Sequence, residues 1–281
     1  MSALSRYSLL AISVVCLLSC SSVSAAWLYV DAFKHSEPFY ETGFELGLQD
    51  VPGATGARAV AADSSDVSLD LVGSGQYGAW LGPFATFTDF RDATVGSWRL
   101  VVEFAGGDAV YDFVVNDFRS PFTPDSFAPS PAMLSPLDGA TGVDPTPTFL
   151  WDNGGTHDGA MESLFVFVWS EADPSVLEFA SSTSGPVTLA SESWTPSVVL
   201  PAGAASFLVQ YETNENEDAN VGDPVFNASL STIADPGITW VTTSGDLFSR
   251  DLIEFAVVPE PAAMSILGLW GLALAWRRPR A

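Results

Sequence analysis

The feature that most constrains this 281-residue chain is a succession of short apolar runs separated by clusters of glycine, proline, aspartate and serine. Runs of this length, rich in valine, phenylalanine, leucine and tryptophan, are typical of β-strands bounded by turns. Residues 27–258 show no sustained apolar repeat of 3.6 residues, so no helix is predicted there. The sequence therefore predicts an all-β protein, with two β-sandwich-like domains.

The strand pattern is clearest in the first half of the chain. The best candidates for strands are Trp27–Ala32, Asp66–Val72, Ser97–Phe104 and Ala109–Asn116. The last two are joined by Ala105-Gly106-Gly107-Asp108, and paired glycines supply the positive φ that a tight turn needs. These two segments are therefore predicted to form a β-hairpin.

A proline-rich stretch divides the chain. Residues 120–131 carry prolines at positions 121, 124, 129 and 131. Proline fixes φ and has no backbone donor, so this stretch is expected to run extended as a linker. The predicted domains are thus 27–119 and 132–257.

The first 26 residues are predicted to be a secretory signal peptide. Leu9–Leu18 is an unbroken apolar run that is too short to span a bilayer. Small residues follow, so cleavage is expected after Ala25 or Ala26. In the alternative, Leu17-Leu18-Ser19-Cys20 resembles a lipobox, and Cys20 would become a lipidated N-terminus.

The charge of residues 27–258 is very one-sided. This span has 33 acidic and six basic residues, a formal net charge of −27. Such a surface repels nucleic acid and anionic lipid headgroups. Both cysteines, Cys16 and Cys20, precede the span, so after cleavage at Ala25 or Ala26 no disulfide stabilises the protein.

The residues that usually carry catalysis are sparse. The two histidines, His35 and His157, form no metal-spaced pair, and Gly-x-Ser-x-Gly is absent. Pairs of carboxylates are too common here to indicate a glycosidase. The sequence therefore predicts a protein that is not an enzyme and needs no cofactor.

Two kinds of ligand remain candidates. Glu215, Glu217 and Asp218 form the densest group of oxygen donors, and the loop 152–158 is the second, although neither matches an EF-hand. A solvated acidic loop is the alternative to calcium there. Trp80 lies in a glycine-rich stretch and is the best candidate for an exposed ring that stacks on a sugar, whereas the other tryptophans of the strands are expected in the core.

The second half resembles a bacterial fibronectin type III-like domain over about residues 130–257. The resemblance rests on Leu134–Trp151, which contains Asp138-Gly139 and ends in a tryptophan, and on Leu200-Pro201-Ala202-Gly203 before Ala205–Glu212. It implies that Trp151 is a core tryptophan. Where the family often has a tyrosine whose hydroxyl bonds back to the turn, this chain has Phe207.

The C-terminal segment 258–281 has three parts in order. Pro259-Glu260-Pro261 is followed by the apolar run Ala262–Trp276 and then by Arg277, Arg278 and Arg280. A helix over the apolar run would be ~22 Å long, and the arginines would hold its end on the cytoplasmic side. The order resembles the PEP-CTERM sorting signal, which implies a transmembrane sorting helix recognised by an exosortase-type membrane protease of a Gram-negative bacterium.

These features together favour an exported protein with a structural or adhesive role at the cell surface or in the extracellular matrix. The resemblance of the tail implies an association with exopolysaccharide or other envelope components, as in a biofilm. A carbohydrate-binding module, with or without calcium, is the alternative. Both hypotheses place the protein outside the inner membrane, anchored by its C-terminal helix before processing.

Overall fold

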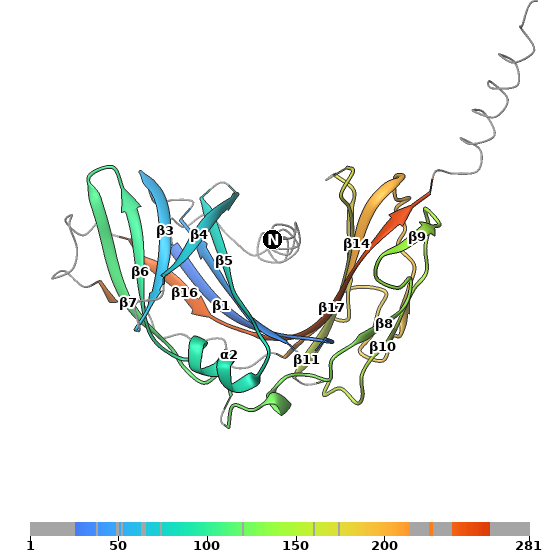
Figure 1. Cartoon of the computed structure of the whole chain (residues 1–281), viewed down its shortest axis with the longest axis horizontal. Coiled ribbons are helices and arrows are strands. Elements are labelled where there is room, and N and C mark those ends of the chain that lie inside the picture. The colour runs from blue at the N-terminus through green and yellow to red at the C-terminus, as the bar shows by residue number, and fades with distance from the viewer. Residues whose placement is uncertain are drawn as a thin grey trace, which may run out of the picture. The chain divides into compact units, whose positions relative to one another are not determined.

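A computed structural model of the chain shows a protein made mostly of β-strands. It describes residues 26–258, except 38, 49–50, 52, 63–65, 74, 120, 160, 174, 214–224 and 227–237. The predicted all-β class is confirmed. The chain folds as two compact units (Figure 1).

The first unit contains the strands of the N-terminal half and two short strands from later in the chain. Seven consecutive strands are antiparallel to their neighbours in the order β1-β2-β5-β4-β3-β6-β7. Their bounds are β1 Ala26–His35, β2 Tyr40–Gly47, β3 Ala54–Ala61, β4 Asp66–Gly73, β5 Gln76–Phe84, β6 Gly96–Phe104 and β7 Gly107–Val115. Two later strands extend this order, since β15 (Val225–Phe226) pairs with β7 and β16 (Trp240–Ser244) pairs in parallel with β1.

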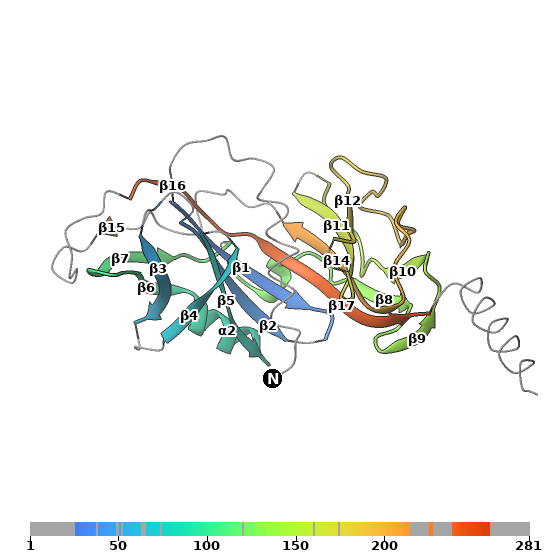
Figure 2. The ribbon, with the colours of Figure 1, turned by 90° about the horizontal axis from the view of Figure 1, so that it is seen from above.

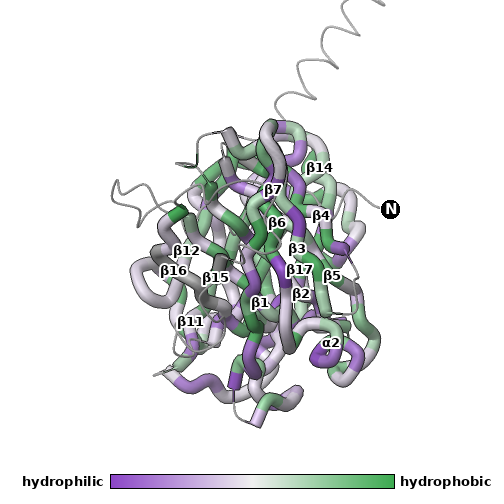
Figure 3. Tube along the Cα trace, turned by 90° about the vertical axis from the view of Figure 1, so that its left-hand side faces the viewer, coloured by the Kyte–Doolittle hydropathy of each residue, from purple (hydrophilic) through white to green (hydrophobic). Residues whose placement is uncertain are grey.

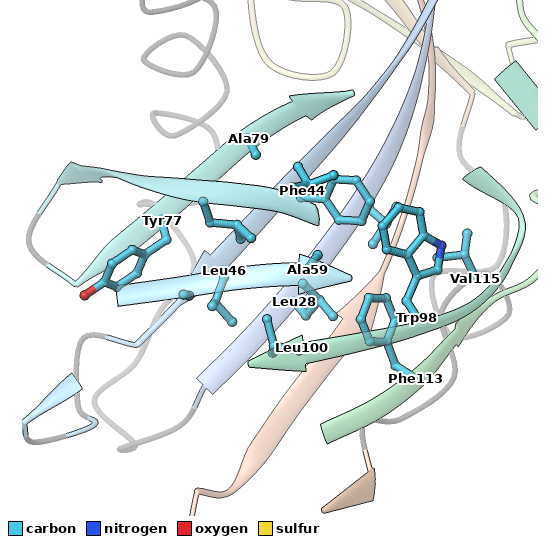
Figure 4. Packing of buried hydrophobic residues seen from close by; sticks show 14 of the residues in the cluster. Leu28, Phe44, Leu46, Ala59, Tyr77, Ala79, Trp98, Leu100, Phe113 and Val115 are labelled. Carbon is cyan, nitrogen blue, oxygen red and sulfur yellow. The ribbon is translucent and has the colours of Figure 1, made fainter. Parts of the chain in front are cut away.

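The strands of this unit form two layers that enclose a core. Strand β4 pairs with β5 in one layer and with β3 in the other, so it forms the corner between them. Alternate residues of each strand point inward, as the two-residue period of a strand requires. Figure 4 shows Phe44, Leu46 and Leu28 of one layer facing Trp98, Leu100 and Phe113 of the other, all of them buried.

The predicted hairpin is confirmed. Strands β6 and β7 pair from Gly96 with Val115 to Phe104 with Gly107. Gly107 has a φ of 132°, which few other residues adopt. Local turn chemistry was therefore enough to locate this pair of strands.

One element contradicts the expectation of no helix in this region. Helix α2 covers Phe87–Thr94, and the hydroxyl of Thr86 accepts a hydrogen bond from the Asp89 amide at 3.1 Å. This N-cap satisfies one of the donors that begin every helix. Phe90 is fully buried beneath the helix, where its ring lies 5.5 Å from that of Tyr40. Tertiary packing on one aromatic side chain thus stabilises a helix too short to show a periodic pattern.

The second unit is a sandwich of two β-layers. One layer is the three-stranded sheet β13-β10-β8, and the other has the order β12-β11-β14-β17, with β9 paired in parallel to β17 (Figure 2). The bounds are β8 Ala132–Ser135, β9 Ala140–Val143, β10 Phe149–Asp152, β11 Glu162–Ser170, β12 Leu177–Ser181, β13 Ser193–Trp194, β14 Gly203–Thr213 and β17 Leu247–Val257. A 3-10 helix at Pro124–Ser126 precedes β8 in the chain.

Aromatic rings fill the centre of this sandwich. Phe149 of β10 stacks on Phe207 of β14 with ring centroids 3.8 Å apart and an interplanar angle of 5°. Trp151 is 1% exposed, as expected for a core tryptophan, and its ring lies 6.1 Å from that of Phe207. Phe207 thus contributes ring packing to the centre of this sandwich.

The two units are not continuous segments of the chain. The first part of unit one ends at Ser130, within the predicted linker 120–131. The described residues of Tyr211–Ser249 also belong to this unit, although the sequence places them in the second domain, 132–257. The predicted domain bounds differ from the observed units because the long strands β14 and β17 each begin in one unit and end in the other.

No helix among the described residues is long and apolar enough to cross a membrane. The predicted sorting helix and the signal peptide both lie outside the described residues.

Candidate functional site

Strands β1, β2 and β5 have a second face, opposite the core, that carries aromatic rings and carboxylates. In antiparallel sheets, residues directly opposite each other point to the same side. Asp31 lies opposite Gly43, which lies opposite Trp80, while Glu45 lies opposite Gly78. Figure 3 shows hydrophobic and hydrophilic residues interspersed along these strands. We call this second surface the acid–aromatic face, and its principal residues are Trp27, Asp31, Phe33, Glu45, Trp80 and Phe248.

Glycines allow the aromatic rings to lie flat on this face. A Cβ added to Gly47 would overlap the indole of Trp27, and one added to Gly43 would lie 2.9 Å from the ring of Phe33. The missing side chains therefore create the space that the rings fill. This is a packing reason for the glycines of the segment Gly43–Gly47.

Three rings form a row across strands β5, β1 and β17. The ring of Phe33 lies 4.7 Å from that of Trp80 and stacks on that of Phe248 at 5.0 Å and 12°. Phe33 is fully buried, whereas Trp80 is only partly buried. The row is thus buried at Phe33 and partly open at Trp80.

Asp31 joins β1 to the turn between β16 and β17. Its Oδ1 accepts a hydrogen bond from the Asp246 amide at 3.1 Å, and the Ala32 amide donates to the Asp246 carbonyl at 2.9 Å. The turn is pressed against β1 so closely that a Cβ on Gly245 would overlap the Val30 carbonyl. The parallel pairing of β16 with β1 ends at Ser244. Beyond it, the Asp31 side chain accepts the hydrogen bond of the Asp246 amide, which therefore has a partner.

Two carboxyl groups of the acid–aromatic face are buried, and their surroundings disfavour the ionised form of each. Glu45 is 5% exposed, and its Oε1 accepts no hydrogen bond from the part of the chain that the structure describes. Burial raises the pKa of Glu45 to about 8. Burial, followed by the charges of Asp246, Glu45 and Glu212, raises the pKa of Asp31 well above its usual value.

Neither histidine occupies a catalytic arrangement in the described residues. The His35 Nε2 lies 2.9 Å from Glu41 Oε2, and its ring stacks on Phe39 at 3.9 Å. The His157 Nε2 lies 2.8 Å from the Asn153 carbonyl oxygen, within one loop. Both contacts are local, and they fix the geometry of a strand end and a turn.

Most tryptophans of the strands are buried, as the sequence predicts, whereas Trp240 of β16 is only partly buried. Four of them, Trp98, Trp151, Trp169 and Trp194, are at most 7% exposed. Trp80 is more accessible than these four, as expected of the candidate platform. Trp27, which the sequence analysis did not single out, lies on the same face as Trp80.

The calcium candidates are only partly visible. Glu215, Glu217 and Asp218 lie outside the described residues. In the loop 152–158, Asp152 Oδ1 accepts the Gly154 amide at 2.9 Å and Asn153 Oδ1 accepts the Gly155 amide at 3.2 Å. Across the described ranges, no group of three or more metal-ligating side chains could hold an ion.

The processing residues also fall outside the described part, apart from one. Ala25, Pro259, Glu260, Pro261, Arg277, Arg278 and Arg280 are not described. Ala26 is the first residue of β1, fully buried, and its amide donates to the Thr239 carbonyl at 3.0 Å.

Sequence reasoning missed Asp31 and Glu45. Each is a carboxylate at an alternate position of an apolar strand, which normally indicates a solvent-facing side chain. The available signal was the alternation in Gly43-Phe44-Glu45-Leu46-Gly47, where the glycines leave room for rings on the face of Glu45.

No protein-family model matches the chain, and no curated protein matches it. Among solved structures, the N-terminal four Ig domains of Dscam1 isoform 6.44 are 11% identical, with a TM-score of 0.19, and the match covers 80% of this chain and 52% of that one. Those of isoform 8.4 are 10% identical, with a TM-score of 0.19 and coverage of 82% and 49%.

A marsupial T cell receptor is 6% identical, with a TM-score of 0.21 and coverage of 80% and 74%. The chain spans about half the length of the Dscam1 chains that it matches. At TM-scores this low the likeness carries no argument.

Proposed function

We propose that this protein is an exported structural or adhesive protein of the cell surface or extracellular matrix, sorted through an exosortase-type system. The observation that carries the proposal is the order of segments along the chain. A secretory signal comes first, a β-rich acidic body follows, and Pro259-Glu260-Pro261 with its apolar and basic segments comes last. Each end directs the body to the outside of the inner membrane.

The predicted cut after Ala25 or Ala26 would leave residues 27–258 in the mature protein. The Ala26 amide donates to the Thr239 carbonyl. A body without cysteine in residues 27–258 then depends on the two aromatic cores for its stability.

Mass spectrometry of the protein from its native cells tests the sorting proposal. We expect an N-terminus at Ala26 or Trp27 and a C-terminus near Pro259-Glu260-Pro261. Replacing Glu260 by alanine should leave the protein in the inner-membrane fraction, whereas the matched change Glu254→Ala, at an exposed carboxylate of β17, should not. A native chain that still ends at Ala281 contradicts the proposal.

Adhesion is tested separately from sorting. Cells that lack the protein should form less surface-attached matrix than the parent, and the unaltered chain supplied in trans should restore it. Equal attachment with and without the protein would rule out the adhesive role while leaving the sorting proposal intact.

Carbohydrate binding is the second candidate, and the geometry at Trp80 favours it. The ring is partly exposed, with Phe33 packed behind it. Glu41 and Glu45 flank Gly43, the residue opposite Trp80. Aromatic rings beside polar groups are a common composition of ligand-binding surfaces.

A glycan array with the full chain in detergent tests this candidate, with and without calcium. We expect Trp80→Ala to abolish binding and Trp80→Phe, which keeps a ring, to retain part of it. The buried tryptophan Trp194 of the second unit supplies the control change, Trp194→Phe. Absence of binding to every arrayed glycan would leave the structural role alone.

A further inference from the structure

The interruption between β16 and β17 is held to β1 by a carboxyl group. Strand β16 pairs in parallel with β1 up to Ser244, opposite Tyr29. At the next turn the Asp246 amide donates to the Asp31 side chain, and the Asp246 carbonyl accepts from Ala32. The position of β16 on β1 therefore depends in part on the state of the Asp31 carboxyl.

That carboxyl lies in an unusual electrostatic environment. Four acidic groups meet there from four segments: Asp31 on β1, Glu45 on β2, Asp246 before β17 and Glu212 on β14. None of the groups that shift the pKa of Asp31 is a basic side chain. On β1, Lys34 lies at an alternate position, on the other face of the strand from Asp31, and His35 contacts Glu41. Arg250 of β17 follows Asp246 by four residues.

Burial adds to the repulsion between these groups. Asp31 is 4% exposed and Glu45 is 5% exposed, so water screens their charges poorly. Glu45 Oε1 accepts no hydrogen bond within the described ranges. An ionised Glu45 would therefore lack compensation for the hydration that it gives up.

We propose that Asp31 and Glu45 form a proton-operated latch, closed when both are protonated, whose ionisation releases the Gly245–Asp246 turn and β16 from β1. The proposal goes beyond the function proposed above and does not depend on it. A neutral Asp31 still accepts the Asp246 amide, so protonation keeps the contact and removes the repulsion. Ionisation of both groups places two further charges beside Asp246 and Glu212.

The direction of the pH effect follows from the raised pKa values. Between the usual carboxyl pKa and about 8 for Glu45, the folded protein binds more protons than the unfolded chain. Stability of the latch is therefore fully present below pH ~4.5 and is lost as the pH rises through about 8. An opened latch would expose the ring contact between Trp240 of β16 and Tyr111 of β7, now at 5.3 Å.

Hydrogen exchange of the full chain, measured by mass spectrometry from pH 5 to 9 and corrected for intrinsic rates, tests the latch. We expect protection of Ala26–Ala32 to fall at least about tenfold across this range, the effect of one pKa unit of difference between open and closed states. Protection of the β6–β7 hairpin should change little. A parallel loss in both regions would indicate global unfolding and would overturn the proposal.

Two variants and a control make the test specific. Glu45→Gln and Asp31→Asn should each flatten the pH dependence, and asparagine keeps an oxygen that can accept the Asp246 amide. Glu103→Gln changes a carboxylate on β6 whose side chain is 46% exposed and should behave as the unaltered protein. Equal pH dependence in Glu45→Gln and the unaltered protein would overturn the latch.

A cation is the alternative occupant of such a site, and calcium distinguishes it. Addition of 1 mM calcium chloride, on the order of extracellular calcium affinities, should leave the loss of protection at pH 8.5 unchanged if protons operate the latch. Restoration of protection by calcium in the unaltered protein, but not in Glu45→Gln, would replace the proton latch by a cation site.

Discussion

The two faces of strands β1 and β2 bury their side chains by different means. On the core face, Leu28, Val30, Phe44 and Leu46 meet apolar side chains from the opposite layer. On the acid–aromatic face, rings lie over glycines and two carboxyl groups are enclosed among them. The first face is stabilised mainly by the hydrophobic effect, whereas the second combines ring packing with an electrostatic cost. Burial of a side chain on this sheet therefore does not by itself stabilise the fold.

The largest expected effect is on the core face. Phe44→Ala removes a fully buried ring that lies 4.9 Å from that of Trp98. We expect a loss of about 4 kcal/mol in the free energy of unfolding, measured by denaturant titration, because a cavity remains. Leu71→Ala, at a side chain that is 64% exposed, serves as the control. A loss below 1 kcal/mol for Phe44→Ala would mean that this face is not a close-packed core.

The next effect should come from the opposite face. Gly47→Ala introduces a methyl group into the space of the Trp27 indole, so the ring must move. We expect a loss of about 2 kcal/mol, the usual scale of overpacking, together with a change in tryptophan fluorescence. Gly56→Ala on β3 provides the matched control, because its added methyl group meets the flexible end of the Glu103 side chain rather than a ring. If Gly47→Ala were neutral, the rings would not be fixed by the glycines.

Glu45→Leu should raise the free energy of unfolding, whereas a substitution on the core face such as Phe44→Ala lowers it. It replaces a buried carboxyl whose pKa is raised to about 8 by an apolar side chain. We expect the free energy of unfolding to rise by about 2 kcal/mol at pH 8.5 and to change little at pH 5, because the carboxyl is already neutral there. Denaturant titrations at both pH values measure this. A loss of stability at pH 8.5 would show that ionised Glu45 is well solvated or paired.

The smallest effect concerns the polar pair on the core face. The hydroxyls of Thr42 and Thr94 are both buried and hydrogen-bonded to each other. Thr42→Val keeps the shape but leaves the Thr94 hydroxyl without this partner, so we expect a loss of about 1 kcal/mol in thermal or denaturant unfolding. The double variant Thr42→Val with Thr94→Val should recover part of the loss. No recovery would show that the pair is not coupled.

The sequence predicted the β6–β7 hairpin from local chemistry, because paired glycines lie between alternating strands. The burial of Trp151 was expected from the resemblance of the segment Leu134–Trp151 to a known family. Helix α2 could not be predicted, because its eight residues owe their stability to Phe90 in a distant aromatic cluster. The membership of the described residues of 211–249 in the first unit also depends on pairing across some 200 residues, which no local pattern encodes.

The candidate site was predicted only at Trp80. Its glycine-rich neighbours are visible in the sequence, and its partial exposure agrees with them. Asp31 and Glu45 were missed because an alternating strand with one polar side assigns carboxylates to solvent. Their burial depends on what packs on the second face, which is a tertiary property. The calcium candidates and the processing residues remain predictions, since they lie outside the described residues.

The pairing of β17 with β9 has a mechanical consequence. The two strands are parallel from Phe255 with Ala140 to Val257 with Val143, and the Val258 amide donates to the Val143 carbonyl at 3.0 Å. Tension applied to the chain beyond Val258 would pull along the axis of β17. Such a load acts on these hydrogen bonds in shear, so they share the force rather than break one after another. The strand next to the C-terminal segment is thus suited to resist pulling from that end.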